Sequence, residues 1–160
     1  MLTSSTDQRV LGYLGRALSL ELSAVQLYST QARLVATWGL AEPAARLQAE
    51  SEEELGHANR IIDRMLAMGV APGASQLRPV ELGRSLVELL EVDMAFENDL
   101  VGLYGDAVQY CARSGYHDDR LFFESLLQEE QSHHAELAQW ILELQGPEQR
   151  PSGGRSRRLR

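Results

Sequence analysis

The chain has 160 residues, of which 44% are hydrophobic and 24% charged, so it is long enough for one domain with a substantial core. Aromatic residues make up only 6%, which argues against a β-rich sandwich or barrel. The single cysteine, Cys111, excludes a disulfide framework and any zinc site with two or more cysteine ligands. No apolar run reaches the ~18 residues that cross a bilayer, and no secretory signal is visible, so we expect a cytoplasmic protein without a membrane partner.

Charge is distributed unevenly along the chain. All 15 basic residues are arginines, and five of them lie between positions 150 and 160. Residues 1–148 carry 23 acids against 10 arginines, which leaves this part with a net charge of −13. Such an acidic body disfavours nucleic-acid binding and attracts cations. Residues 147–160 are rich in Arg, Gly and Ser without apolar periodicity, which predicts a disordered tail whose partner, if any, stays open.

Residues 1–146 show helical periodicity, with apolar residues three and four positions apart. A first helix is predicted over about 6–38, capped by Ser4, Ser5 or Thr6 and stopped by Gly39. A second is predicted from Pro43 to about Met68. After a connection over 69–78, Pro79 is expected to open a third helix that reaches about Arg113, and a fourth runs from about Tyr116 to Gln145. Two short links and one long crossover predict an all-α four-helix bundle.

Acidic residues and histidines interrupt these helices in a repeated pattern. Glu21 and Glu97 stand alone where an apolar residue is expected, and two E-x-x-H motifs are formed by Glu54 with His57 and by Glu130 with His133. Residues i and i+3 lie on the same side of a helix, so each motif offers a carboxylate and an imidazole to one ion. Glu21, Glu54, His57 and Tyr28 each recur 76 positions later, as Glu97, Glu130, His133 and Tyr104. The first two helices are therefore predicted to be repeated as the third and fourth, with six ligands meeting at one point.

A cluster of four buried carboxylates is untenable without compensating charge, and two divalent ions would supply it. Hard oxygen ligands with one imidazole per metal suit iron or manganese, with zinc as the usual competitor. An iron pair of this kind can be oxidised by O2 or H2O2. The alternative interpretation is that Glu54 and Glu130 are solvated acids on glutamate-rich helix faces.

The sequence resembles the bacterioferritins over residues 7–145. The likeness rests on L-x-x-E-L-x-A-x-x-x-Y from Leu18 to Tyr28, on TWGL at 37–40, on E-S-x-x-E-x-x-H-A-x-R from Glu50 to Arg60, on D-x-A-x-E from Asp93 to Glu97, and on E-E-x-x-H from Glu129 to His133. The resemblance implies a ferritin-like bundle, a hollow 24-subunit shell, and oxidation of Fe2+ at a di-iron ferroxidase centre with storage of ferric mineral. It implies that Glu21, Glu54, His57, Glu97, Glu130 and His133 are the ferroxidase ligands. Tyr28 matches a tyrosine that the family places beside the site, where it supplies an electron or a hydrogen bond; a core aromatic is the alternative.

Three departures from the family pattern change what is expected. The methionine with which the family ligates haem between two subunits is replaced by Leu55, so little or no haem is expected by this mode. The histidine of an inner-surface site is replaced by Ala49, although its acid is kept in kind as Glu53. No clear fifth helix follows the bundle, which bears on whether the 24-mer forms.

Two other functions are compatible with these residues. One is a non-storage di-metal peroxidase or oxidase of the rubrerythrin type or a manganese catalase, although Cys111 alone cannot form the four-cysteine module that rubrerythrins usually add. The other is a scaffold or partner subunit that co-assembles with a haem-bearing homologue, which Leu55 would complement.

Overall fold

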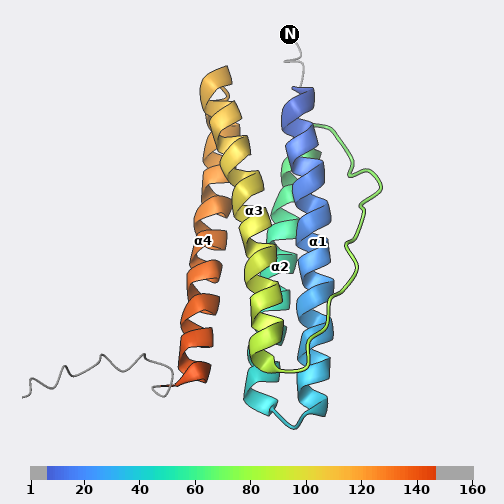
Figure 1. Ribbon diagram of the computed structural model, residues 1–160. Helices are drawn as coiled ribbons and strands as arrows, with labels where there is room; N and C mark the ends of the chain where they lie inside the picture. Colours follow the sequence, from blue (N-terminus) through green and yellow to red (C-terminus); the bar gives the residue numbers. More distant parts are fainter. Residues whose placement is uncertain (1–6, 147–160) are drawn as a thin grey trace, which may run out of the picture.

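The computed structural model describes residues 7–146 and places four α-helices in this range, with no strand among the described residues. They are α1 (Gln8–Thr37), α2 (Ala41–Ala67), α3 (Leu86–Ser114) and α4 (His117–Gln145). Helices α1 and α2 form one antiparallel hairpin and α3 and α4 the other, and a long crossover joins α2 to α3 along the outside of α1 (Figure 1). The predicted all-α bundle with one long crossover is confirmed. None of the described helices is long and apolar enough to cross a membrane.

The core runs along the axis of the bundle and takes one face from each helix. Leu14, Leu47, Leu89 and Leu126, one from each helix, are all 0% exposed. Burying a leucine side chain contributes about 1.5–3 kcal/mol. Because apolar residues recur at helical spacing on all four helices, the apolar faces pack together along the bundle axis and the polar faces remain outside.

The start of α1 differs from the sequence prediction by a few residues. Its N-cap is Asp7, whose side chain accepts hydrogen bonds from the backbone N–H groups of Arg9 and Val10. Ser4, Ser5 and Thr6, the predicted caps, lie outside the described residues, as does the predicted disordered tail 147–160. The two hairpin turns are made at Gly39 and Gly115, whose φ angles of 77° and 73° favour glycine.

The prediction that Pro79 opens the third helix is wrong, because α3 begins at Leu86. Ser85 caps it by accepting a hydrogen bond from the N–H of Glu88, and the Glu88 carboxylate accepts one in return from the N–H of Arg84. This reciprocal pair satisfies donors at the helix start, so the helix begins where the cap is, not at the proline. Gly83 lies just before this cap. A Cβ at this position would lie 2.9 Å from the Cβ of Glu88, which is too close for a side chain.

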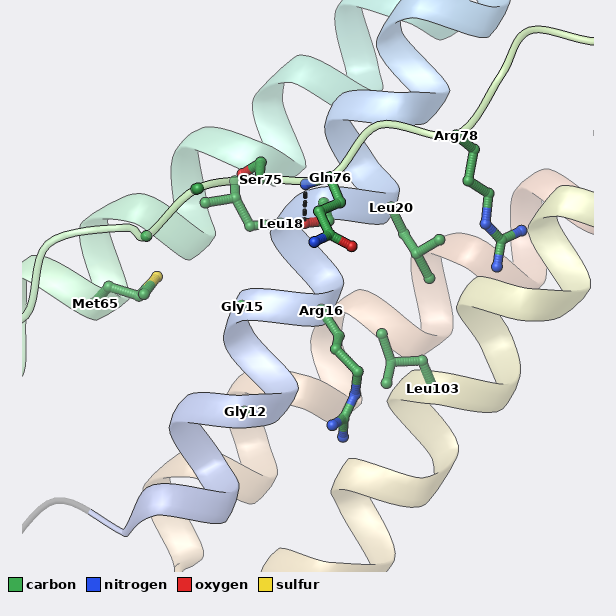
Figure 2. A pocket seen from close by; sticks show the side chains of 13 residues that line it. Gly12, Gly15, Arg16, Leu18, Leu20, Met65, Ser75, Gln76, Arg78 and Leu103 are labelled. Atoms are coloured by element: carbon green, nitrogen blue, oxygen red, sulfur yellow. Dashed lines mark hydrogen bonds between the residues drawn. The ribbon is translucent and has the colours of Figure 1, made fainter.

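The crossover is fixed to the bundle by side chains of α1 and α3. The hydroxyls of Ser19 and Ser23 accept hydrogen bonds from the backbone N–H groups of Gln76 and Arg78, and the Arg78 guanidinium forms an ion pair with Asp99. Figure 2 shows this segment passing over α1. Beneath it lies a cavity of about 570 Å³, lined in part by Gly12, Gly15 and Arg16. These bonds hold the two hairpins in the register that positions the central side chains.

Candidate metal centre

Six polar side chains from all four helices meet in the middle of the bundle, where the core would otherwise be apolar. Four are glutamates and two are histidines, and none is more than 6% exposed. Helix α1 supplies one, α2 two, α3 one and α4 two: Glu21, Glu54, His57, Glu97, Glu130 and His133. The structure thus brings together every residue of the ligand set that the spacing of 76 singles out.

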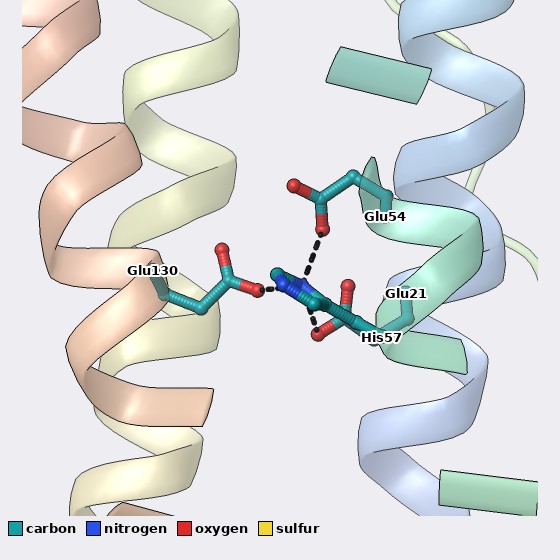
Figure 3. Close-up of side chains that lie close together, drawn as sticks. All are labelled: Glu21, Glu54, His57 and Glu130. Carbon is teal, nitrogen blue, oxygen red and sulfur yellow. Dashed lines mark ion pairs between the residues drawn. The ribbon is translucent and has the colours of Figure 1, made fainter. Parts of the chain in front are cut away.

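The six side chains form two overlapping groups of four. Glu21, Glu54, His57 and Glu130 can each offer one ligand atom with all four atoms within 4.8 Å of one another (Figure 3). The second group replaces Glu21 and His57 by Glu97 and His133. Glu54 and Glu130 belong to both groups, so each could bridge two ions placed side by side. The repeat in the sequence becomes a twofold relation between the two groups.

The distances are short around both histidines. Nδ1 of His57 lies 2.8 Å from Oε1 of Glu130 and 3.4 Å from Oε2 of Glu54. Nδ1 of His133 lies 2.9 Å from Oε1 of Glu54 and 3.5 Å from Oε2 of Glu130. The two imidazole rings are stacked, with centroids 5.6 Å apart. Both rings therefore turn the same nitrogen toward the shared carboxylates.

These atoms converge without forming aligned hydrogen bonds. Buried side-chain atoms with no hydrogen-bond partner include Oε2 of Glu21, Oε2 of Glu97, both carboxylate oxygens of Glu54 and Glu130, and Nδ1 of His57 and His133. A buried polar atom without a partner costs about 1–3 kcal/mol, and folded proteins keep few of them. Donor atoms that point at a common centre instead of at each other suit a coordinated ion.

The protonation of the metal-free site follows from burial and from neighbouring charges. Burial, and the proximity of Glu54, raise the pKa of Glu21 well above its usual range. Burial, and the proximity of Glu130, do the same for Glu97. Burial therefore favours the protonated, neutral form of both acids when no metal is bound.

The shared carboxylates and the histidines behave in the opposite way. Burial opposes ionisation of Glu54 and Glu130, but their contacts with the two histidines outweigh it, and that of Glu54 with Glu21 adds to them, so both pKa values are lowered. Burial also opposes the imidazolium form, yet Glu130 and Glu54 raise the pKa of His133 to about 12. The pKa of His57 is raised in the same way. These shifts favour two ionised carboxylates that face two imidazolium ions in the metal-free site.

Two tyrosines hold the two lone glutamates from the opposite hairpin. The Tyr28 hydroxyl on α1 donates a 2.7 Å hydrogen bond to Oε1 of Glu97 on α3, and the Tyr104 hydroxyl on α3 donates a 2.5 Å bond to Oε1 of Glu21 on α1. Both tyrosines are 0% exposed. Tyr28 was predicted from the sequence as a site residue, whereas Tyr104 was not, although the spacing of 76 residues already linked the two tyrosines.

The outer nitrogens of the histidines face a second pair of acids, which sequence analysis did not place there. Nε2 of His133 lies 2.5 Å from Glu53, and Nε2 of His57 lies 3.2 Å from Glu129. Glu53 and Glu129 are themselves 76 residues apart, so the spacing contained the signal. The two differ in one respect, because Arg60 forms an ion pair with Glu129.

Three further buried polar residues lie on one side of the site only. Gln31 and Asp93 are 0% exposed, and their side-chain oxygen and nitrogen atoms have no aligned hydrogen-bond partner. Glu50 is mostly buried, with its carboxylate 3.9 Å from Nε2 of His133. Burial and the charge of Glu50 raise the pKa of Asp93 to about 8, although Gln31 opposes the shift. The positions 76 residues away carry Ala107, Ala17 and Leu126. The repeat is thus broken just beyond the site.

Leu55, next to Glu54 in the sequence, points away from this centre. Its side chain is 44% exposed on α2. A hydrocarbon side chain offers no atom that could ligate a metal.

The chain is similar to known proteins along most of its length. Residues 11–146 match the Ferritin family, described as a ferritin-like domain. The bacterioferritin of Rhodobacter capsulatus is 40% identical over 127 residues, 79% of each chain, and that of Brucella melitensis is 32% identical with the same coverage. A structure of the R. capsulatus protein, described as having a metal-free dinuclear site and haem iron in a crystallographic special position, aligns with a TM-score of 0.81 and 39% identity over 84% of each chain.

Proposed function

Because this chain belongs to the bacterioferritins, an iron-storage family of ferritin-like proteins, we propose that it oxidises Fe2+ at the six-residue centre and stores the ferric product inside a hollow oligomer. The observation that carries the proposal is the pair of overlapping ligand groups with shared Glu54 and Glu130. Two adjacent ions bound to a common carboxylate can each give up one electron to the same oxidant.

In this proposal Glu21 with His57, and Glu97 with His133, each hold one ferrous ion, and Glu54 and Glu130 bridge the two. Carboxylate oxygens with a single imidazole per ion suit iron in both oxidation states. With H2O2 as oxidant, two Fe2+ and two protons yield two Fe3+ and two water molecules. The bundle supplies a rigid frame, and the hydrogen bonds of Tyr28 and Tyr104 orient Glu97 and Glu21.

Charge balance supports the binding of two divalent ions. The directions of the pKa shifts favour a metal-free centre in which Glu21 and Glu97 hold protons and both histidines are cationic, which is neutral overall. Loss of these protons leaves four carboxylates and two neutral imidazoles, and two divalent cations restore neutrality. Ion binding therefore exchanges protons for metal without burying a net charge.

Iron oxidation tests this proposal directly. Anaerobic protein titrated with Fe2+ and then mixed with O2 should show a fast phase that saturates at two irons per subunit. His57→Ala should slow this phase about tenfold or more. His134→Ala, which removes the histidine next to His133 but outside both ligand groups, should retain it. An equal rate of fast oxidation in parent and His57→Ala protein would contradict the assignment.

We also propose that the subunits form a closed homo-oligomer, as storage of a mineral requires an enclosed volume. Particle mass and iron content measured on the same purified sample test this. A monomer or dimer with rapid peroxide turnover would favour a di-metal peroxidase instead. A second type of subunit in the particle would favour assembly with a haem-bearing homologue.

Haem content provides an independent measurement. Leu55 presents no ligand atom, so the purified homo-oligomer should show little haem absorbance. Leu55→Met supplies a thioether at the exposed surface of α2 and should raise haem uptake. Equal haem content in both proteins would mean that haem is held elsewhere.

A further inference from the structure

The aromatic rings of this protein are concentrated along one route from the metal centre to the surface. Four of its five tyrosines belong to a set of rings in contact, which we call the aromatic chain: Tyr104, Phe123, Tyr13, Tyr110 and Tyr116. Successive centroids are 6.3, 6.2, 5.9 and 6.2 Å apart, in that order. These spacings are within the range of direct ring contact. The chain leads toward the end of the bundle at which α3 turns into α4.

The two ends of the aromatic chain have different environments. At the inner end, Tyr104 is 0% exposed and donates its hydroxyl hydrogen bond to Glu21. At the outer end, Tyr116 is 37% exposed. The carboxylate of Asp7 accepts hydrogen bonds from both Tyr110 and Tyr116, at 2.9 and 3.1 Å. Each end therefore has a carboxylate that can take a phenolic proton.

Tyr28 provides an internal comparison. It makes the equivalent hydrogen bond to Glu97 and is equally buried. Among residues 7–146, however, no aromatic ring contacts it in the way that Phe123 contacts Tyr104. The two tyrosines are alike toward the metal centre and differ in their connection to the surface.

Charged groups beside the rings favour oxidation at the outer end. The guanidinium groups of Arg16 and Arg9 lie over the rings of Tyr13 and Tyr110, at 5.0 and 4.9 Å from the centroids. A cation over a ring makes loss of an electron from it harder. Within the described part of the chain no such cation lies over Tyr116, and Asp7 faces its hydroxyl. An electron vacancy is thus more stable on Tyr116 than on Tyr13 or Tyr110.

We propose that the aromatic chain carries oxidising equivalents from the metal centre to the surface. Tyr104 is the electron donor at the centre, and Tyr116 is the site at which an external one-electron reductant returns the missing electron to the aromatic chain. This inference rests on the proposed function, which supplies the oxidant. Electron transfer between rings in contact is fast because tunnelling falls off steeply with distance. Phe123, which is hard to oxidise, serves as a bridge between Tyr104 and Tyr13.

The proposal accounts for reduction of O2 when iron is scarce. O2 needs four electrons and four protons to become two water molecules, and two Fe2+ supply only two electrons. The other two come from two tyrosine oxidations, each of which loses one electron and one proton: O2, two Fe2+, two phenols and two further protons yield two waters, two Fe3+ and two tyrosyl radicals. The proton of Tyr104 moves along its hydrogen bond to Glu21 and returns when the aromatic chain resupplies the electron. The net proton is lost from Tyr116, to Asp7 and then to solvent. Without these electrons the product is H2O2.

The experiment detects the tyrosyl radical itself and not the oxidation state of the metal. Protein loaded anaerobically with two Fe2+ per subunit is mixed with O2 and a nitroso spin trap, and the modified residue is located by peptide mass spectrometry. The parent should carry the adduct at Tyr116. Tyr104→Phe, which keeps the ring and removes the hydroxyl, should lose most of this adduct and release several-fold more H2O2. Tyr28→Phe removes the equivalent hydrogen bond at Glu97 without touching the aromatic chain, so the adduct formed per iron oxidised is compared between the two variants and should fall only in Tyr104→Phe. Trp38→Phe changes an exposed ring outside both the metal centre and the aromatic chain, and this control should retain the iron-oxidation rate and the adduct.

Iron oxidation is recorded in the same samples, so the two proposals fail separately. If the parent shows no fast oxidation, the proposed function is wrong and the electron route with it. If iron is oxidised rapidly but no adduct forms at Tyr116, the electron route alone is wrong. An adduct at Tyr116 that persists in Tyr104→Phe would also overturn it, because the radical would then come from a diffusing oxidant.

Discussion

The α1–α2 and α3–α4 hairpins are equivalent at the metal centre and different immediately around it. Within the centre every ligand, both tyrosines and both outer acids recur after 76 residues. Beyond it, Arg60 pairs with Glu129, whereas no arginine between residues 7 and 146 pairs with Glu53, and buried Asp93 corresponds to Ala17. Chemistry that needs two equivalent ions keeps the ligands alike, whereas access, proton supply and electron supply require the two sides to differ.

The largest expected effect comes from the carboxylates that both halves share. Glu130→Ala removes a ligand from both groups, and Glu21→Ala removes one from a single group. Loss of even a supporting residue at a metal site costs about 10–100-fold, so Glu130→Ala should slow the fast iron-oxidation phase by more than about 100-fold. Glu21→Ala and Glu97→Ala should have smaller effects of equal size. Stopped-flow oxidation with two Fe2+ per subunit measures all three, and unequal effects of Glu21 and Glu97 would break the equivalence.

The number of protons released on metal binding tests whether the two hairpins are equivalent in charge. Two protons leave the glutamates Glu21 and Glu97, and two leave the histidines, when the centre binds metal. Binding of two Co2+ per subunit at pH 7 should therefore release about four protons, and affinity should rise with pH. Calorimetry in buffers of different ionisation enthalpy counts the protons. Release of about two would mean that the glutamates or the histidines are already deprotonated.

Asp93 tests the side of the centre where the repeat is broken. Its pKa is raised on folding from 3.8 to about 8, so the native state binds the proton more tightly than the unfolded chain does. Between these pH values each rise in pH costs the folded state stability. Asp93→Asn should therefore stabilise the metal-free protein against heat at pH 8 more than at pH 5. A gain that does not depend on pH would show that Asp93 is not protonated in the parent.

The smallest effect is expected at Arg60. Its ion pair with Glu129 is more than one-third exposed on both sides, and such pairs contribute about 0–1 kcal/mol. Arg60→Ala should change the free energy of unfolding by less than about 1 kcal/mol while making Glu129 as free as Glu53. Urea unfolding of the metal-free protein, with Arg33→Ala as a control at an exposed arginine of α1, measures the difference. A loss of several kcal/mol would show that Arg60 is part of the core packing.

The six converging side chains that we propose as ligands could be predicted from the sequence, because residues on one face of a helix recur about every 3.6 positions and the two hairpins repeat each other. The E-x-x-H pairs and the lone Glu21 and Glu97 needed no tertiary information beyond that. The start of α3 could not be placed from Pro79, because a local side-chain cap at Ser85 competes with the proline and decides the boundary. Tyr104 was within reach of the same reasoning and was missed.

Helical periodicity shows which residues share a face, so the amino-acid pattern was enough to predict two similar helical hairpins with four acids and two histidines at matching positions. Which faces meet is visible in the folded structure alone. There, Glu53 and Glu129 lie behind the histidines, Asp93 is fully buried, and Tyr104 is the innermost ring of the aromatic chain. Contacts between helices depend on their rotation and register, which are set by the packing of the whole core and not by any one segment.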